Sequence, residues 1–369
     1  MAKFHFVLLA ILLAVSPCAA AKDTYYIGFI GNTNNATSNI LYNALTLTAD
    51  TFNSTNTSYA ISTVFFQEND PNAGDSINNT GNLLGVIGVL NADNRALIEK
   101  VGEAPLISVA SEYSGLNAGK RSNVFRMSAS DAELAADTAR FLVSVSQKDR
   151  FGIVYSNESG EYRDMAEAFQ RAAERNHAKA DYFKEVDPDR KDFEAVLLRL
   201  RDIKAKNIYF AGRASQAAML ARQSSAMNVG ADFSSTRLIY AQSFVKASKA
   251  GGQGAVFASI EPSSIYGFKA LRPFLKRYYE LNKDDDMHIP YLYDAANMLI
   301  AGLLADKKSK SDMTKYLHAA NYEGVTGDIY FNDGGERVVS PVYFYIIRGR
   351  EFLQRSLRGA EAADYAKMK

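Results

Sequence analysis

Polar or small side chains follow two strand-like apolar runs between Gly85 and Tyr113. Residues at the carboxyl ends of parallel strands meet at one edge of a sheet, which is where ligands bind in open α/β sheets. A carboxylate at such a position could accept the amine of a ligand. We therefore expect a binding edge at six positions, Asn91, Ala92, Asp93, Ser111, Glu112 and Tyr113.

Several of these positions also have a purely structural interpretation. Asp93 precedes a helical pattern, and an aspartate there can cap the helix by accepting hydrogen bonds from its first N–H groups. Glu112 and Tyr113 could belong to a solvated loop, although loops at strand ends also carry binding residues. The sequence leaves both alternatives open.

The second part of the chain offers two further side chains for ligand binding. Arg213 opens a loop between a strand pattern and a helix pattern, and its guanidinium fork suits a carboxylate or a phosphate. It could equally be a surface charge, because arginine is mostly exposed. Tyr162 could stack on a flat ligand face. If Asp93 or Glu112 faces Arg213 across a cleft, the ligand carries polar groups of both signs.

Signatures of catalysis and of metal binding are scarce. Beyond the first 21 residues the chain has three histidines, His177, His288 and His318, and none belongs to an HExxH or CxxC pattern. The sequence contains no Gly-x-Ser-x-Gly elbow and no Walker A loop. The glycine-rich segment 250–255 precedes a strand pattern, which is the wrong context for a phosphate loop. We therefore expect a protein without enzymatic activity, cofactor or metal.

The first 21 residues have the pattern of a secretory signal peptide. Lys3 is followed by an apolar run over residues 6–15 and then by small residues that end in an A-x-A sequence at Ala21. The run is too short to span a bilayer. Cleavage after Ala21 would deliver the product to the periplasm or another extracytoplasmic space. Acylation of Cys18 is the minor alternative, because Pro17 fits poorly beside it.

The mature chain has no net charge and no cysteine. Removing residues 1–21 takes away one lysine and the single cysteine, which leaves 41 Lys+Arg against 41 Asp+Glu. A neutral balance gives no general attraction to nucleic acid. Stability without disulfides must come from burial, and a chain of this length with 47% hydrophobic residues can supply it.

Strand-like and helix-like segments alternate along nearly the whole mature chain. Continuous apolar runs such as residues 24–31 and 150–157 alternate with amphipathic patterns such as residues 40–53 and 131–147. This alternation predicts parallel sheets covered by helices on both faces. Two stretches of similar size predict an α/β fold with two doubly wound parallel-sheet lobes. One strand expected in the second stretch is the segment 236–243.

Five groups of segments occur in an order and at a spacing that are similar to one family. They are VIGVL with APLISVAS, VFRMSASDAELA, KDFEAVLLRLRDIKAKNIYFAG, YDAANMLIAGL and YEGVTGDIYFNDGG. They extend over nearly the whole mature chain, from about Tyr25 to about Phe352. The chain resembles the type I periplasmic substrate-binding proteins of ABC importers, the Leu/Ile/Val-binding protein group.

The resemblance implies a fold and a function. It implies two lobes, joined by crossing hinge strands, that close on a ligand and so signal occupancy to a membrane permease. Residues 22–145 with 263–338 would form the first lobe, and residues 146–262 with 339–369 the second. The ligand would be a small polar molecule such as an amino acid, an amide or a related carboxylate. The partner would be an ABC permease in the inner membrane, and the protein would act as a monomer.

The binding positions depart from the family pattern. Asn32 belongs to the loop that normally reads Pro-x-Ser/Thr-Gly, and residues 91–93 lack the hydroxyl groups that the family carries there. Ser159 stands at an aromatic position of the family and Gln242 at an acidic one. We therefore do not expect a branched-chain amino acid ligand. The departures are also compatible with an alternative, in which the same fold acts as a sensor or a protein-interaction module of the cell envelope.

Overall fold

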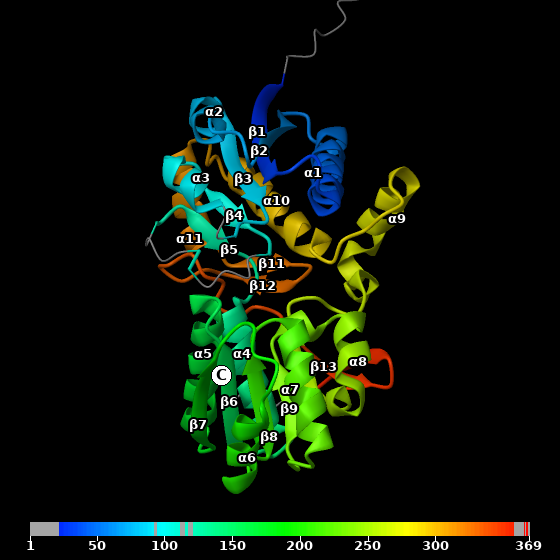
Figure 1. The fold of residues 1–369 in the computed structure, drawn as a ribbon. Helices are drawn as coiled ribbons and strands as arrows, with labels where there is room; N and C mark the ends of the chain where they lie inside the picture. Colours follow the sequence, from blue (N-terminus) through cyan, green and yellow to red (C-terminus); the bar gives the residue numbers. More distant parts are fainter. Residues whose placement is uncertain are drawn as a thin grey trace, which may run out of the picture.

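The computed structural model describes residues 22–91, 94–110, 115–116 and 121–357, together with Tyr365 and Lys367. Two sheets, each accompanied by helices, and one short two-stranded ladder make up the fold (Figure 1). This confirms the predicted α/β class with two sheet-centred halves. No helix in the described part of the chain has the length and apolar character needed to cross a membrane.

The first sheet is entirely parallel. Its strands are β1 (Asp23–Gly31), β2 (Tyr59–Gln67), β3 (Leu83–Gly88), β4 (Leu106–Ser108) and β5 (Val124–Arg126). They lie in the order β2-β1-β3-β4-β5. Every residue of β3, β4 and β5 is buried, as expected for parallel strands that are covered on both faces.

Helices from two distant parts of the sequence cover the first sheet. They are α1 (Ala36–Thr55), α2 (Ala73–Asn79), α3 (Arg95–Lys100), α9 (Arg272–Leu281), α10 (Ile289–Leu304) and α11 (Lys310–Ala319). The largest core on this sheet joins Phe29 of β1, Leu45 of α1 and Leu299 of α10, all fully buried. Helix α10 therefore completes the first half of the molecule, although it follows the parallel strands of the second sheet in the chain.

The second sheet is parallel except at one edge. Its strands are β6 (Arg150–Ser156), β7 (Lys179–Val186), β8 (Asn207–Ala211), β9 (Asp232–Ser235), β10 (Val256–Ser259), β13 (Tyr343–Arg348) and β14 (Glu351–Arg355). They lie in the order β14-β13-β10-β9-β8-β6-β7. Strands β6 to β10 are parallel, whereas β13 and β14 form an antiparallel hairpin that is added beside β10.

Among the described residues, five α-helices accompany the second sheet, and two of them begin at serine caps. They are α4 (Asp131–Ser144), α5 (Gly160–Arg175), α6 (Glu194–Asp202), α7 (Ala214–Ala226) and α8 (Gln242–Ser248). At the start of α4 the Ser130 hydroxyl accepts a hydrogen bond from the Glu133 N–H, and the Glu133 carboxylate accepts one from the Ser130 N–H. This capping box fixes where α4 begins.

Three short segments connect the two halves. Residues 127–130 lead from β5 to α4, residues 260–264 lead from β10 back toward α9, and residues 338–342 lead into β13. The ladder of β11 (Tyr322–Gly324) and β12 (Gly327–Ile329) lies between the two sheets in Figure 1. The chain therefore passes between the halves three times.

The boundaries expected at residues 145, 262 and 338 stay a prediction. Helix α4 packs against α5, and its buried Phe141 shares a core with Phe151 of β6. This packing favours placing α4 in the second half. We propose that the first crossing is the segment 127–130, ahead of α4.

The prediction of a strand at residues 236–243 is wrong. The strand of this region is β9, and the predicted segment instead forms a single 3₁₀ turn over Arg237–Ile239 and then enters α8. The segment packs into the core although its backbone is not extended. Ile239 is fully buried, and the Tyr240 ring lies 5.4 Å from that of Phe257. A short apolar run marks burial, and it does not distinguish a strand from a tight turn.

Candidate ligand-binding site

The carboxyl ends of the two parallel sheets approach each other at the first crossing. β5 ends at Arg126, and only residues 127–130 separate it from α4. The first residue of α4, Asp131, accepts a hydrogen bond from Arg237, two residues beyond the end of β9 (Nε to Oδ1, 3.1 Å). In open α/β sheets ligands bind at this edge. We refer to it as the ligand edge.

Three of the predicted site residues lie near one another on the ligand edge of the second sheet. The Arg213 guanidinium, after β8, forms an ion pair with the Glu158 carboxylate, after β6, and the Arg213 side chain remains 55% exposed. Partial burial and the nearby Glu158 raise the pKa of the Tyr162 hydroxyl, and Arg213 opposes this shift. The Ser159 hydroxyl accepts a hydrogen bond from the Glu161 N–H (3.2 Å) and so caps α5.

A buried carboxyl group lies close to these side chains. Asp131 is 6% exposed, and burial together with the charge of Glu161 raises its pKa to about 7, while Arg126 acts in the opposite direction. The Tyr209 hydroxyl is also buried near Asp131, and it has no hydrogen-bond partner among the described residues. The ligand edge therefore holds a group whose charge changes near neutral pH.

The pH dependence of stability should report on Asp131. Folding raises the pKa of this carboxyl from 3.8 to about 7, so the folded protein binds the proton more tightly than the unfolded chain does. The resulting stabilisation is complete below about pH 4 and is lost as the pH rises toward 7, by up to about 4 kcal/mol at 1.36 kcal/mol per pH unit. In urea unfolding between pH 4.5 and 8, we expect the Asp131→Asn variant to gain stability relative to the wild type as the pH rises.

An exposed aspartate provides the control for this measurement. Asp189, in the loop between β7 and α6, is exposed, and the Asp189→Asn variant should follow the wild-type curve. A difference between Asp131→Asn and the wild type that stays constant with pH would show that the Asp131 carboxyl titrates alike in both states.

A second set of polar side chains connects the two halves at the second crossing. The Glu261 carboxylate lies 3.9 Å from Nε2 of His288, which precedes α10. Nδ1 of His288 lies 2.5 Å from Oδ1 of Asp286, whose other oxygen accepts a hydrogen bond from the Thr37 hydroxyl of α1 (3.0 Å). Burial acts to raise the pKa of Asp286, but its contacts with His288 and Thr37 outweigh burial and lower it. The starts of α1 and α10 are thereby connected to the second half.

The predicted residues of the first sheet are only partly described. The side-chain oxygen of Asn32 accepts a hydrogen bond from the Asn34 N–H (2.9 Å), so it holds the loop after β1. Asn91 is exposed after β3, and its N–H donates to the Asn94 side chain (2.9 Å). The roles of five residues outside the described part of the chain stay predictions: Ala92, Asp93, Ser111, Glu112 and Tyr113.

Other polar side chains at the ligand edge were not predicted. Gln67 is the last residue of β2, and its amide donates to the Thr33 hydroxyl (2.6 Å); Glu68 follows β2 and accepts from Asn94 (3.3 Å). Glu158 follows β6 in the same way. The strand-end rule that singled out Asn91 and Arg213 applies equally to Gln67, Glu68 and Glu158, so these residues carried a usable signal.

The structure places Gln242 away from the ligand edge, which corrects its prediction. Its side chain donates to the Arg350 carbonyl in the turn between β13 and β14 (3.0 Å). β13 is antiparallel to β10, with Val256 opposite Ile346, so the turn that follows β13 lies at the amino end of β10. Gln242 therefore contacts the opposite edge of the second sheet.

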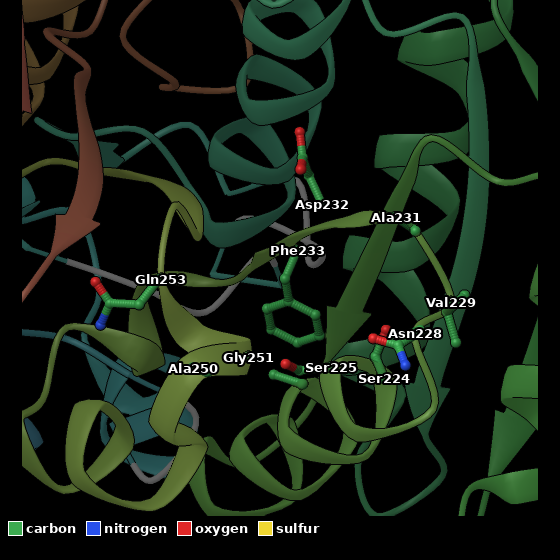
Figure 2. A pocket seen from close by; sticks show the side chains of 12 residues that line it. Ser224, Ser225, Asn228, Val229, Ala231, Asp232, Phe233, Ala250, Gly251 and Gln253 are labelled. Carbon is green, nitrogen blue, oxygen red and sulfur yellow. The ribbon is translucent and has the colours of Figure 1, made fainter.

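The cavity in Figure 2 lies at this opposite edge as well. It has a volume of about 290 Å³ between the end of α7, the start of β9 and residues 250–253. The Phe233 ring lies in its middle, with Asn228 on one side and Gln253 on the other. Its lining comes from the amino ends of β9 and β10 and is remote from the ligand edge. Among the described residues, no group of three or more His, Cys, Asp or Glu side chains could hold a metal.

Proteins of known structure share this fold. A protein of Rhodospirillum rubrum, provisionally assigned as a branched-chain amino acid ABC transporter, is 16% identical with a TM-score of 0.75, over 91% of this chain and all of that chain. A Desulfitobacterium hafniense ABC transporter substrate-binding protein in complex with Leu is 16% identical with a TM-score of 0.68, over 90% of this chain and all of that chain. A solute-binding protein of an R. palustris ABC transporter in complex with benzoate is 15% identical with a TM-score of 0.60, over 90% and 95% of the two chains.

The sequence itself identifies the family. The search of curated proteins found no match. A family model described as periplasmic binding protein matches residues 46–351, which include most of both sheets. This chain therefore belongs to the periplasmic binding protein family.

Proposed function

We propose that the protein captures a small polar ligand with a carboxylate group between its two halves and delivers it to an ABC importer. Arg213 carries this proposal, because it is half exposed at the ligand edge and is oriented by its ion pair with Glu158. The guanidinium fork can bind both oxygens of a carboxylate. A ligand carboxylate would replace or share the contact that Glu158 now makes.

The start of α7 supports an anionic ligand group at Arg213. Arg213 is the residue immediately before α7, and no described side chain caps this helix. The first N–H groups of a helix lack intrahelical partners and carry a partial positive charge. A carboxylate bound to Arg213 would therefore lie beside a second source of positive potential.

The related structures support the same ligand class. Two of the structures described above hold a named ligand, Leu in one and benzoate in the other, and both of these molecules carry a carboxylate. We propose an amino acid, an amide or a related small carboxylate for this protein, with Asp93 or Glu112 available for an amine. Tyr162 would contact the body of the ligand at the second sheet.

The remaining features of the proposal follow from the family and from the first residues. We propose export after cleavage at Ala21, a periplasmic location and an ABC permease of the inner membrane as the partner. The protein would act as a monomer and as a binder without enzymatic activity. These properties suit a carrier that must release its ligand unchanged.

Substitution of Arg213 should weaken ligand binding without unfolding the protein. The Arg213→Ala variant loses a charge-assisted contact of about 1.5–3 kcal/mol, so the Kd of a carboxylate found in a thermal-shift screen should rise about 10- to 100-fold. Glu158→Gln removes the competing carboxylate and should lower the Kd or leave it unchanged. Because the ion pair is exposed, both variants should keep the free energy of unfolding within about 1 kcal/mol of the wild type.

The screen would use residues 22–369 with amino acids, amides, small carboxylates, nucleosides and aromatic acids. A ligand at about 100 times its Kd stabilises the folded state by about 2.7 kcal/mol, which is readily measured. Equal affinity of the wild type and Arg213→Ala for a confirmed ligand would remove Arg213 from the site. A folded protein that responds to none of these compounds would favour the protein-interaction module.

A further inference from the structure

We propose that the second half carries a separate site for a phosphate-bearing polyanion, at the edge of its sheet opposite the ligand edge. A cavity of about 610 Å³ lies between α8 and the turn that joins β13 to β14. This volume is within the range of small-molecule sites in proteins. Its lining consists of Gln242, Val245, Lys246, Lys249, Gln253, Gly349 and Arg350.

The lining carries three positive charges and no carboxylate. Lys246, Lys249 and Arg350 are exposed, and none of them forms an ion pair with another described residue. The nearest carboxylate in the sequence belongs to Glu351, which does not line the cavity and lies opposite Arg348 in the register of the β13–β14 ladder. Because the mature chain as a whole is neutral, three cations around one cavity produce a local positive potential that attracts anions.

Hydrogen bonds fix the turn that presents Arg350. Gln242 donates to the Arg350 carbonyl (3.0 Å), and Gln253 donates to the Gly349 carbonyl (3.0 Å). The Gln253 side-chain oxygen also accepts from the Gly349 N–H (2.7 Å). The turn is therefore held to the body of the second half from two sides, which reduces the conformational entropy that Arg350 would lose on binding.

The two lysines lie on the same face as Gln242. Positions 242, 246 and 249 are four and three residues apart, which is the spacing of neighbours on a helix surface. Lys249 is the residue immediately after α8, and it has φ 52° and ψ −129°, a conformation that favours glycine. A non-glycine residue held in such a conformation costs about 1–3 kcal/mol, and such residues occur mostly at functional sites. This strained residue is one of the cations that line the cavity, as a role in binding requires.

The chemistry of the lining selects the class of ligand. Lysine and arginine bind phosphate oxygens strongly, and three separate cations match an anion with more than one charge. No aromatic side chain lines the cavity, so it offers no stacking surface for a base or an aromatic ring. Pyrophosphate, a phosphorylated sugar and a phospholipid headgroup share the required chemistry.

Titration of the whole mature protein tests the site. We would measure binding of pyrophosphate by calorimetry at low salt, and co-flotation with vesicles of phosphatidylglycerol or of phosphatidylcholine. The variants are Lys246→Ala, Lys249→Gly and Arg350→Ala, and the matched control is Lys184→Ala at an exposed position of β7. We expect each cavity variant to lower the affinity about 10-fold and the control to leave it unchanged.

The Lys249→Gly variant separates binding from folding. Glycine relieves the backbone conformation, so this variant should keep or raise the unfolding temperature while it loses affinity for the anion. Pyrophosphate binding that depends on the three cations would establish a free polyanion as ligand. Binding to phosphatidylglycerol vesicles alone, with the same dependence, would establish a lipid headgroup.

Two results would overturn the proposal. The first is a folded wild-type protein that binds neither pyrophosphate nor phosphatidylglycerol vesicles. The second is binding that survives all three substitutions, or that Arg213→Ala abolishes, because the anion would then occupy another surface or the ligand edge. Because the cavity is remote from Arg213, failure of this site would leave the proposed carboxylate binding untouched.

Discussion

The Asp294→Ala variant should lose about 3–5 kcal/mol of its free energy of unfolding. Asp294 lies in α10, is 1% exposed, and its carboxylate accepts three hydrogen bonds. They come from the Val325 N–H (2.8 Å), the Thr326 N–H (2.9 Å) and the Thr326 hydroxyl (2.6 Å). Alanine leaves these donors buried without an acceptor, and each such donor costs about 1–3 kcal/mol.

The loss extends to a buried arginine. Arg337 donates to the Thr326 hydroxyl (2.9 Å) and to the Thr326 carbonyl (3.0 Å), and the same hydroxyl donates to Asp294. Asp294 therefore supplies negative charge close to the buried Arg337 guanidinium, and the alanine variant removes it. Urea unfolding of the wild type and of the Asp294→Ala variant measures the effect. The matched control is Asp328→Ala, at an exposed position of the neighbouring strand β12, which should change the stability by less than about 1 kcal/mol. Equal stability of the two variants would contradict a structural role for Asp294.

The Glu336→Ala variant should lose about 2–4 kcal/mol, because it removes the carboxylate that pairs with a buried arginine. Arg126 has no exposed surface, and its Nε lies 2.6 Å from Oε2 of Glu336. The Glu336 side chain is 26% exposed, so water reduces the loss relative to a fully buried pair. The pair connects the end of β5, just before the first crossing, to the turn just before the third crossing.

Removal of the charge on both sides tests this explanation. The Glu336→Ala variant still buries the Arg126 charge but lacks the carboxylate that compensates it. The double variant Arg126→Met with Glu336→Ala removes this charge as well, so it should recover part of the free energy of unfolding that the single variant loses. Asp333→Ala, in the same turn but exposed, is the control for the turn itself. A double variant less stable than either single variant would show that the pair does not act as a unit.

The sheets and most of their helices could be predicted because their signals are local. The apolar run at residues 24–31 lies within β1, and the amphipathic pattern at residues 131–147 contains α4. The Asn-Asp-Gly-Gly sequence at residues 332–335, which is typical of a turn, also forms one, with the Asn332 N–H bonded to the Glu336 carbonyl (2.9 Å). The segment 236–243 could not be assigned from its pattern. Its apolar residues pack against β10 and β13, and such packing needs apolar residues whether or not the backbone is extended.

The candidate site was predictable only where position in an element decided it. Arg213 was found because the strand and helix patterns placed it at a strand end, whereas Tyr162, within α5, was named as an aromatic ring that could stack on a ligand. The ion pair of Arg213 with Glu158 joins residues that are 55 positions apart, and no local pattern encodes such a contact. Asp131 was expected only as the start of a helix, since its burial results from the crossing of the chain beside it. Gln242 was placed by its correspondence to a family position, whereas its side chain contacts the Arg350 carbonyl at the opposite edge of the sheet.

The position of α10 has a consequence for how a newly synthesised chain folds. The core that joins Phe29 and Leu45 to Leu299 cannot form until α10 has left the ribosome. By that time the strands from β6 to β10 are complete, whereas the first five strands still expose an apolar face. Contacts between such distant segments slow folding. The first half therefore completes its core only after α10 docks, although most of its strands come first in the chain.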